Sequence, residues 1–342
     1  MDGSEVIPYP SHSMQSSSLS PDAIITTTMK TTSSPIALLG IPLDLGAENL
    51  GVDIGPKAFR YTKLVDKLAS AGLNVTDHGD IPCPDRHTTK VGDPKQRHLK
   101  EILAVSEATA AKVEGFVRAG QRAVGLGGDH SVTLGLVAGA SAAVDGDIGL
   151  IYFDAHGDMN TAATTLTGNI HGMHLASLMG FGGAELVNAY RPSAKVNKQN
   201  LLHIGGSDFD QAELELIRRE NLSAFTLRDL LSTSLAPLWV KVDELASRVN
   251  HIWISFDLDV MNEQYAPGAG MPNRAGLSYR EIAAIADYIG EKCPVIGVDI
   301  VEYNPLLDRD SRTADLAAEL IAKFFGADYS WYTDYLAKNQ RS

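Results

Sequence analysis

The 342-residue chain is long enough for one large α/β domain or two average ones, and its 44% hydrophobic content provides for a substantial core. Its formal net charge of −13 disfavours nucleic acids and anionic membranes as partners and leaves metal ions and cationic small molecules. Cys83 and Cys293 stand far apart, which excludes a disulfide framework and a thiolate zinc site, so we expect a reducing, cytoplasmic location. No apolar run approaches the roughly 20 residues that span a bilayer.

The beginning of the chain differs in composition from the rest. Residues 1–34 are rich in Ser, Thr and Pro and lack apolar periodicity, so we expect a disordered tail. Asp2 and Glu5, with no apolar core after them, oppose a secretory signal, and the lack of Arg disfavours a transit peptide. Neither a linker nor a fixed-period repeat follows, so residues 35–342 are predicted to form a single domain.

Apolar runs and amphipathic segments alternate along this domain. In chain order the predicted elements are a strand over 35–41, a helix over 55–71, a strand beginning at 74–75, a helix over 99–119, a strand over 122–126, a helix ending near 143, a strand over 148–153, a helix over 171–179, a strand over 201–205, helices over 211–220 and 234–248, a strand over 251–256, a helix over 278–292, a strand over 295–301 and a helix over 313–325. Gly120 is placed to end the second helix, and Ser278 with Glu281 forms a capping-box pattern. This alternation predicts an α/β fold with a mostly parallel sheet covered on both faces.

Acidic and histidine residues follow four of the predicted strands. They are His130 after the strand over 122–126, Asp154, His156 and Asp158 after 148–153, Asp257 and Asp259 after 251–256, and Glu302 after 295–301. Sites in open parallel sheets gather at the carboxyl ends of strands, so we expect these side chains to converge. On an extended chain, residues 154, 156 and 158 also point to one side.

Two His and four Asp residues form a mixed oxygen and nitrogen set that suits Mn²⁺ better than copper or structural zinc. Four carboxylates exceed the needs of one ion, and carboxylates can bridge, so a two-metal site is predicted. A lone Asp-x-Asp would more often be a turn or a helix cap, and it is the repetition at four strand ends that favours a metal site.

At these residues the sequence resembles the ureohydrolase family, and within it the arginases, over residues 35–326. The resemblance rests on Gly127-Gly128-Asp129-His130-Ser131, Asp154-Ala155-His156-Gly157-Asp158, Ser255-Phe256-Asp257-Leu258-Asp259 and Glu302-Tyr303-Asn304-Pro305. It implies a three-layer α/β/α sandwich, assembled into homo-oligomers, either trimers or hexamers. It also implies two Mn²⁺ ions per subunit. His130, Asp154, Asp158 and Asp257 would hold one ion, and His156, Asp154, Asp257 and Asp259 the other.

The implied reaction is hydrolysis of a guanidinium group to urea and an amine by a metal-bridging hydroxide. Because the guanidinium stays charged at physiological pH, the reaction also needs a counter-charge, which we assign to Glu302. Asp259 would pass a proton to the leaving nitrogen, and His171 would exchange protons with solvent.

The loop after Asp158 bears on the substrate. Asn160, Thr167 and Asn169 match the positions that hold an α-carboxylate in arginases, and Asp210 with Glu213 matches the pair that receives the α-amino group. The resemblance therefore implies L-arginine as substrate and L-ornithine as product. Without the family, these residues would be interpreted as a polar loop and a capped helix.

Two positions depart from the arginase pattern. Ser207 stands where Arg is usual, and Met271 stands where Thr is usual and cannot donate a hydrogen bond. Agmatine or another guanidino compound, such as guanidinobutyrate, is therefore the alternative substrate. A catalytically silent metal-binding or assembly protein would be expected to lose the ligand set, whereas all six residues are present here. A nucleotide-binding protein would carry Gly-x-Gly-x-x-Gly after its first strand, and this sequence does not.

Overall fold

The computed structural model describes residues 34–232, 234–327 and 329. The predicted disordered tail lies outside these residues apart from Ser34. The prediction of a single domain over 35–342 likewise extends beyond the described part of the chain.

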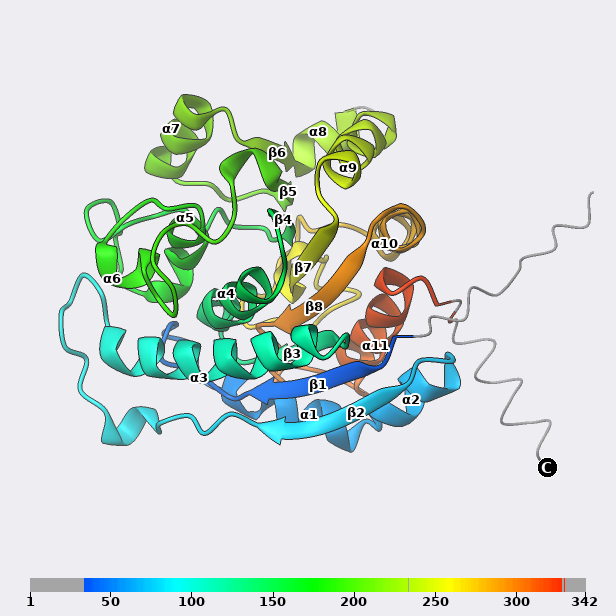
Figure 1. Cartoon of the computed structure of the whole chain (residues 1–342), viewed down its shortest axis with the longest axis horizontal. Helices are drawn as coiled ribbons and strands as arrows, with labels where there is room; N and C mark the ends of the chain where they lie inside the picture. The colour runs from blue at the N-terminus through cyan, green and yellow to red at the C-terminus, as the bar shows by residue number, and fades with distance from the viewer. Residues whose placement is uncertain (1–33, 233, 328, 330–342) are drawn as a thin grey trace, which may run out of the picture. The chain divides into compact units, whose positions relative to one another are not determined.

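The centre of the fold is an eight-stranded sheet in the order β2-β1-β3-β8-β7-β4-β5-β6, in which every neighbouring pair is parallel (Figure 1). The strands are β1 (Ile36–Ile41), β2 (Val75–Asp80), β3 (Arg122–Gly127), β4 (Ile148–Phe153), β5 (Leu201–Gly206), β6 (Ser223–Thr226), β7 (His251–Asp257) and β8 (Val295–Val301). The central strands are buried on both faces, which explains why they are continuous apolar runs in the sequence.

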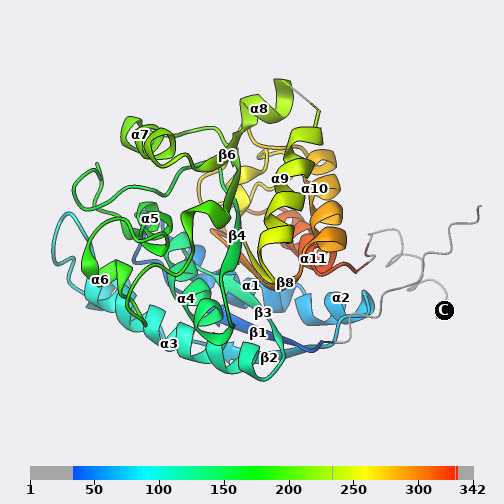
Figure 2. The ribbon, with the colours of Figure 1, turned by 45° about the horizontal axis from the view of Figure 1, so that its top comes forward.

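Helices cover both faces of the sheet (Figure 2). They are α1 (Gly55–Tyr61), α2 (Leu64–Ser70), α3 (Leu99–Arg118), α4 (Thr133–Ala143), α5 (His174–Leu178), α6 (Ala184–Val187), α7 (Gln211–Glu220), α8 (Leu227–Ser232), α9 (Ala236–Arg248), α10 (Tyr279–Lys292) and α11 (Arg312–Phe324). One buried cluster joins the sheet to α1, α2, α9, α10 and α11, and the other joins it to α3, α4 and α5. The predicted three-layer α/β/α architecture is confirmed.

Several local predictions were wrong. The helix expected over 55–71 is broken at Lys63, whose φ is 59°, although Phe59, Leu64 and Leu68 all remain buried in one cluster. The strand expected from 74–75 extends to Asp80, which pairs with Gly40 beyond an irregularity in the register. The short elements α6, β6 and α8 were not predicted, since each has six residues or fewer, which is too short for a recurring apolar pattern. Within the described chain, no helix has the length and apolarity to cross a membrane.

Candidate metal centre and substrate pocket

The sheet order brings the four strands with acidic or histidine ends into one contiguous block, β3-β8-β7-β4. His130 begins the 3-10 helix His130–Val132 after β3, and Asp154 follows β4 directly. Asp257 is the last residue of β7, and Glu302 follows β8. Because all four strands are parallel, these residues lie at the same edge of the sheet, as the sequence predicted.

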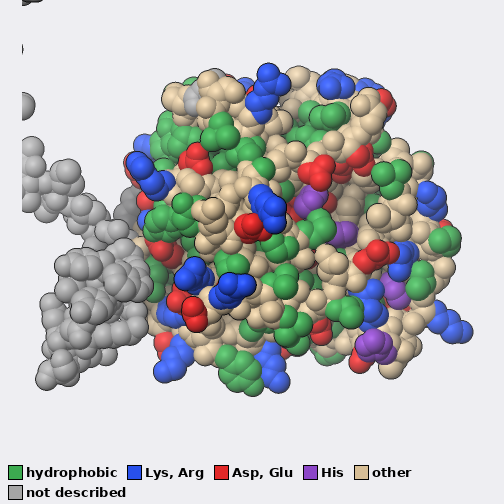
Figure 3. All heavy atoms as spheres, turned by 180° about the vertical axis from the view of Figure 1, so that it is seen from behind, with side chains coloured by type: hydrophobic (Ala, Val, Ile, Leu, Met, Phe, Trp, Pro, Cys, Tyr) green, Lys and Arg blue, Asp and Glu red, His purple; other side chains and the backbone are tan. Residues whose placement is uncertain are grey.

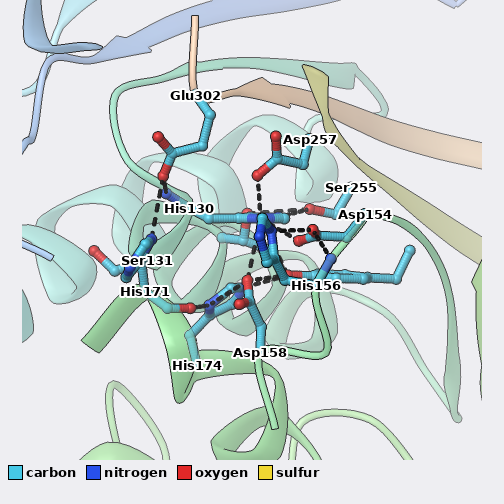
Figure 4. A network of polar contacts seen from close by, with 12 residues as sticks. His130, Ser131, Asp154, His156, Asp158, His171, His174, Ser255, Asp257 and Glu302 are labelled. Atoms are coloured by element: carbon cyan, nitrogen blue, oxygen red, sulfur yellow. Dashed lines mark hydrogen bonds and ion pairs between the residues drawn. The ribbon is translucent and has the colours of Figure 1, made fainter. Parts of the chain in front are cut away.

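Five of the six predicted metal ligands form two adjoining groups that share Asp154. Figure 4 labels four of the five, all except Asp259. In the first, His130 Nδ1 lies 3.0 Å from Asp154 Oδ2 and 3.1 Å from Asp257 Oδ2. In the second, His156 Nδ1 lies 3.3 Å from Asp154 Oδ1 and 3.0 Å from Asp259 Oδ2. Asp154 therefore presents one carboxylate oxygen to each group.

The sixth predicted ligand, Asp158, joins the first group by a route that the sequence did not predict. Its Oδ2 lies 3.3 Å from His130 Nδ1. The extended chain expected over 154–158 is not present, because Asp158 has a φ of 53°. A left-handed turn, rather than strand alternation, brings its carboxylate to His130.

The chemistry of these groups fits divalent cations. Asp154 Oδ2 is buried, and apart from its contact with His130 Nδ1 at 3.0 Å it receives no hydrogen bond from the residues described, which leaves lone pairs of this oxygen for a cation. The separations of 3.0–3.3 Å between His130 and its carboxylate neighbours match adjacent corners of an octahedron whose metal–ligand bonds are about 2.1 Å. Oxygen and imidazole donors are also the set that Mn²⁺-like ions accept.

The hydrogen bonds of His130 leave one ring nitrogen available as a ligand. Ser255 Oγ donates to Asp299 Oδ1 at 2.7 Å, so its oxygen accepts from His130 Nε2, 2.9 Å away. With one proton on Nε2, Nδ1 is the ring nitrogen that faces Asp154 and Asp257, and it would bind a metal ion once its own proton is lost.

The centre carries more negative charge than its histidines can neutralise. Burial and the neighbouring Asp259 and Asp154 raise the pKa of Asp257 well above its usual value. Burial and Asp154 raise the pKa of Asp259 to about 6. Burial lowers the pKa of His130, but hydrogen bonds with Asp154 and Asp257 outweigh it and raise that pKa well above the usual range. Carboxylates and histidines that retain protons so strongly indicate a site that binds cations.

Glu302 and His171 form a second acid–base pair beside this centre. Glu302 is buried with a φ of 58°, and its Oε1 accepts a hydrogen bond of 2.9 Å from the backbone N–H of His130. The same oxygen lies 3.5 Å from His171 Nδ1. Burial opposes protonation of His171, but the hydrogen bond to Glu302 raises its pKa to about 9. His171 therefore carries a proton at neutral pH.

A cavity of about 470 Å³ opens onto these groups. Figure 3 shows acidic and histidine side chains gathered around a hollow in one face of the molecule. The predicted catalytic and substrate residues all line the cavity, namely Asp259, His171, Glu302, Asn160, Thr167, Asn169, Asp210, Glu213 and Met271. Ser207 is not among its lining residues. Glu48, Asn49 and Asp208 line it as well, and the sequence analysis did not select them.

Asp210 and Glu213 have a structural task besides facing the cavity. They form a capping box at the start of α7, in which Asp210 accepts from the N–H of Glu213 and Glu213 accepts from the N–H of Asp210. The other oxygen of Asp210 accepts a 2.7 Å hydrogen bond from Asn160 Nδ2. The capped-helix interpretation and the substrate interpretation thus concern the same side chains.

Two further residues contact the metal-ligand groups and were missed by the sequence analysis. Tyr152 Oη lies 2.7 Å from Asp158 Oδ2, and His174 Nε2 lies 3.2 Å from that hydroxyl. A signal for Tyr152 was present, because it stands two residues before Asp154 and so faces the same side of β4.

Comparisons with known proteins agree with this architecture. The family model described as the arginase family matches residues 34–326. The arginase of Brevibacillus brevis is 37% identical over 293 residues, which are 85% of this chain and 97% of that protein. The crystal structure of Bacillus cereus arginase superposes with a TM-score of 0.81 at 34% identity, over 87% of this chain and all of that one. That of Entamoeba histolytica arginase in complex with L-ornithine gives 0.79 at 26% identity, over 86% of this chain and 99% of that one. The chain belongs to the arginase family.

Proposed function

We propose that this protein hydrolyses L-arginine to L-ornithine and urea with two Mn²⁺ ions per subunit. The observation that carries the proposal is a single cavity lined both by metal-ligand candidates and by Glu302, Asn160 and Asp210. The relatives named arginase support the activity, and the Entamoeba histolytica relative was crystallised with L-ornithine, the proposed product.

In this proposal His130, Asp154, Asp158 and Asp257 hold one metal ion, and His156, Asp154, Asp257 and Asp259 hold the other. When bound, two such ions lower the pKa of water so that a nucleophile is available near neutral pH. The choice of Mn²⁺ rests on the hard oxygen and nitrogen donors.

The remaining residues bind the guanidinium and move protons. The Glu302 carboxylate pairs with the guanidinium and offsets its permanent charge. Asp259, whose pKa burial raises to about 6, accepts a proton and returns it to the leaving nitrogen. His171 has 23% of its side chain exposed and so exchanges protons with solvent.

At the amino-acid end of the substrate, Asn160, Thr167 and Asn169 donate hydrogen bonds to the α-carboxylate. Asp210 and Glu213 accept from the α-ammonium group. Neutral donors suit a carboxylate and acids suit an ammonium group, which matches an α-amino acid with a guanidino tail.

A specific observation keeps agmatine as the second candidate. Met271 lines the cavity, and no Lys or Arg is among the lining residues that the structure describes, so no such side chain there favours a carboxylate. Agmatine, which lacks the carboxylate, would forgo no ion pair with a Lys or an Arg.

A substrate panel tests both candidates by urea release from Mn²⁺-loaded protein, with Asp154→Ala as the inactive control. L-arginine carries both end groups, agmatine lacks the carboxylate and 4-guanidinobutyrate lacks the amine. Under our proposal L-arginine has the highest kcat/KM. No urea from L-arginine above the control would overturn the proposal, and an equal or higher kcat/KM for agmatine would favour the alternative.

Two variants separate the end groups. Asp210→Asn keeps a helix-capping side chain but removes the charge that receives the amine. It should lower kcat/KM for L-arginine and agmatine and leave kcat/KM for 4-guanidinobutyrate unchanged. Thr167→Val removes a donor to the carboxylate, so it should lower kcat/KM for L-arginine and 4-guanidinobutyrate and leave kcat/KM for agmatine unchanged.

The proposal also includes a cytoplasmic location and a homo-oligomer, either a trimer or a hexamer. The sparse cysteines support the first, and resemblance to the family supports the second. Sedimentation velocity of the full chain tests the assembly, which a monomer at micromolar concentration would contradict.

A further inference from the structure

The carboxylates in the metal-ligand groups are not all oriented in the same way. Asp154, Asp257 and Asp259 each accept a hydrogen bond from a backbone N–H, at 2.7, 2.8 and 3.1 Å respectively. Within the described chain, the hydrogen bond to the Asp158 carboxylate comes instead from a side chain, the Tyr152 hydroxyl at 2.7 Å. The Asp158 carboxylate thus depends on the Tyr152 hydroxyl for the orienting hydrogen bond that a backbone N–H donates to the other three carboxylates.

The Tyr152 hydroxyl is a meeting point of three groups. Besides Asp158, it lies 3.1 Å from His130 Nδ1 and 3.2 Å from His174 Nε2, and Tyr152, His130 and His174 are all buried. The rings of Tyr152 and His130 are stacked, with centroids 4.7 Å apart and 3° between their planes. Tyr152 therefore contacts His130 through its ring and Asp158 through its hydroxyl.

His174 has two possible functions. His130, Asp158 and His174 each offer a ligand atom within 4.8 Å of the others, which is compatible with a further metal site. However, His174 Nδ1 lies 2.6 Å from the carbonyl oxygen of His171, to which it must donate its proton. Only Nε2 is then free to act as a ligand, and it faces the Tyr152 hydroxyl. A metal ion between these three residues would have to displace that hydroxyl.

The phenol has one proton and three nearby groups that could accept it, Asp158 Oδ2, His130 Nδ1 and His174 Nε2. The shorter distance and the charge of the carboxylate assign the proton to Asp158. His174 borders the hydroxyl on its other side, and its own ring is fixed by the bond to His171. His130 Nδ1 then remains directed at its carboxylate neighbours.

We propose that Tyr152 and His174 are positioning residues, not metal ligands. Tyr152 holds Asp158 through its hydroxyl proton for the metal ion bound by His130, and His174, fixed by its bond to the carbonyl of His171, packs beside that hydroxyl. This inference rests on the two-metal centre of the proposed function. It extends that centre to a tyrosine and a histidine whose groups do not touch the substrate.

The test measures Mn²⁺ binding instead of activity. Full-length wild-type and variant proteins are dialysed against a series of free Mn²⁺ concentrations, and bound Mn²⁺ per chain is counted. Tyr152→Phe keeps the stacked ring and removes only the hydroxyl. It should still bind two Mn²⁺ at saturation, but with the Kd of one ion raised about 10–100-fold, the usual effect of losing a partner of a metal ligand.

Tyr190→Phe is the matched control, because Tyr190 also donates its phenol proton to a carboxylate, Glu114, away from the site. It should leave both Kd values unchanged. His174→Gln keeps a polar side chain beside the Tyr152 hydroxyl and should bind two Mn²⁺ with a smaller change in Kd than Tyr152→Phe. Circular dichroism confirms that each variant is folded.

Each contrary result has a distinct meaning. A His174→Gln variant that binds at most one Mn²⁺ at saturation would make His174 a ligand and overturn this inference. Unchanged Kd values in Tyr152→Phe would show that the hydroxyl does not hold Asp158. Wild-type protein that binds fewer than two Mn²⁺ would instead overturn the proposed function, and this inference with it.

Discussion

Two of the candidate functional residues adopt a backbone conformation that disfavours their side chains. Asp158 and Glu302 have φ values of 53° and 58°. The left-handed conformation costs a residue with a Cβ about 1–2 kcal/mol, and such strain is concentrated at functional sites. In both cases the turn directs a carboxylate at His130. The Asp158 carboxylate lies beside the imidazole ring of His130, and the Glu302 carboxylate accepts a hydrogen bond from the backbone N–H of His130.

The charge of Glu302 can be removed with little change of shape. Glu302→Gln retains an oxygen to accept the N–H of His130 but cannot offset the guanidinium charge. We expect kcat/KM for L-arginine to fall about 10²–10³-fold, as when a preorganised electrostatic partner is lost, in a variant that circular dichroism shows to be folded.

Glu48→Gln is the control for this variant, because Glu48 lines the same cavity but is paired with Arg97. Its kcat/KM should stay within about threefold, a change of roughly 0.7 kcal/mol. An equal loss in both variants would mean that general acidity of the cavity, rather than Glu302, matters.

The pair of His171 and Glu302 predicts a pH-dependent contribution to stability. Its partner raises the pKa of His171 from about 6.5 to about 9, so the folded state holds this proton more tightly than the unfolded state. The resulting stability is complete below pH 6.5 and is lost as pH rises through 9. In metal-free protein, urea unfolding should therefore separate wild type from His171→Asn most at pH 6 and least at pH 10. A constant separation would contradict the pairing.

For individual residues, the sequence was a better guide to which side chains belong to the candidate site than to how those side chains are arranged. Acids and histidines directly after apolar runs form a local pattern, so His130, Asp154 and Asp257 could be identified without a structure. Tyr152 was missed, because in the run over 148–153 it is one more apolar residue and its place two residues before Asp154 is a weak signal. Its contact with Asp158 depends on a left-handed turn that no local pattern requires.

Helices with strong end signals were predicted well. The capping box of α10, in which Ser278 accepts from the N–H of Glu281, was recognised from two residues. By contrast, the break between α1 and α2 has no Gly or Pro to mark it, and the edge strand β6 is only half-buried, so its residues do not alternate. Pairing with β5 defines that strand, and the sequence of its four residues does not predict such pairing.

Removal of the α10 cap should destabilise the protein without affecting its chemistry. Ser278→Ala should lower the free energy of unfolding by about 1 kcal/mol, because the N–H of Glu281 loses its acceptor. Urea denaturation measures this effect. Ser247→Ala, which removes a bond within α9 to the carbonyl of Glu244, should change it by less than about 0.5 kcal/mol. Equal effects would contradict the assignment of the cap.

At the scale of the whole molecule, metal binding and pH are linked. Without metal, the His130 ring retains its second proton through neutral pH, because its carboxylate neighbours raise its pKa. A metal ion must displace that proton, so Mn²⁺ affinity should increase as pH rises, by about tenfold per pH unit for each proton released.

Calorimetric titration with Mn²⁺ at pH 6, 7 and 8, in buffers of different ionisation enthalpy, counts the released protons. Identical affinities at pH 6 and 8 would contradict the expectation.

The position of β8 has a consequence for biosynthesis. This strand is the last of the sheet in sequence, yet it lies between β3 and β7 at the middle of it. Until residues 295–301 have left the ribosome, the nascent chain can form only two separate half-sheets, each with an unpaired inner edge. Parallel pairing of segments so distant in sequence is slow, and exposed edges invite aggregation. Emergence of β8 closes both edges at once and delivers Glu302 to His130, so completion of the fold and of the candidate site is one late event.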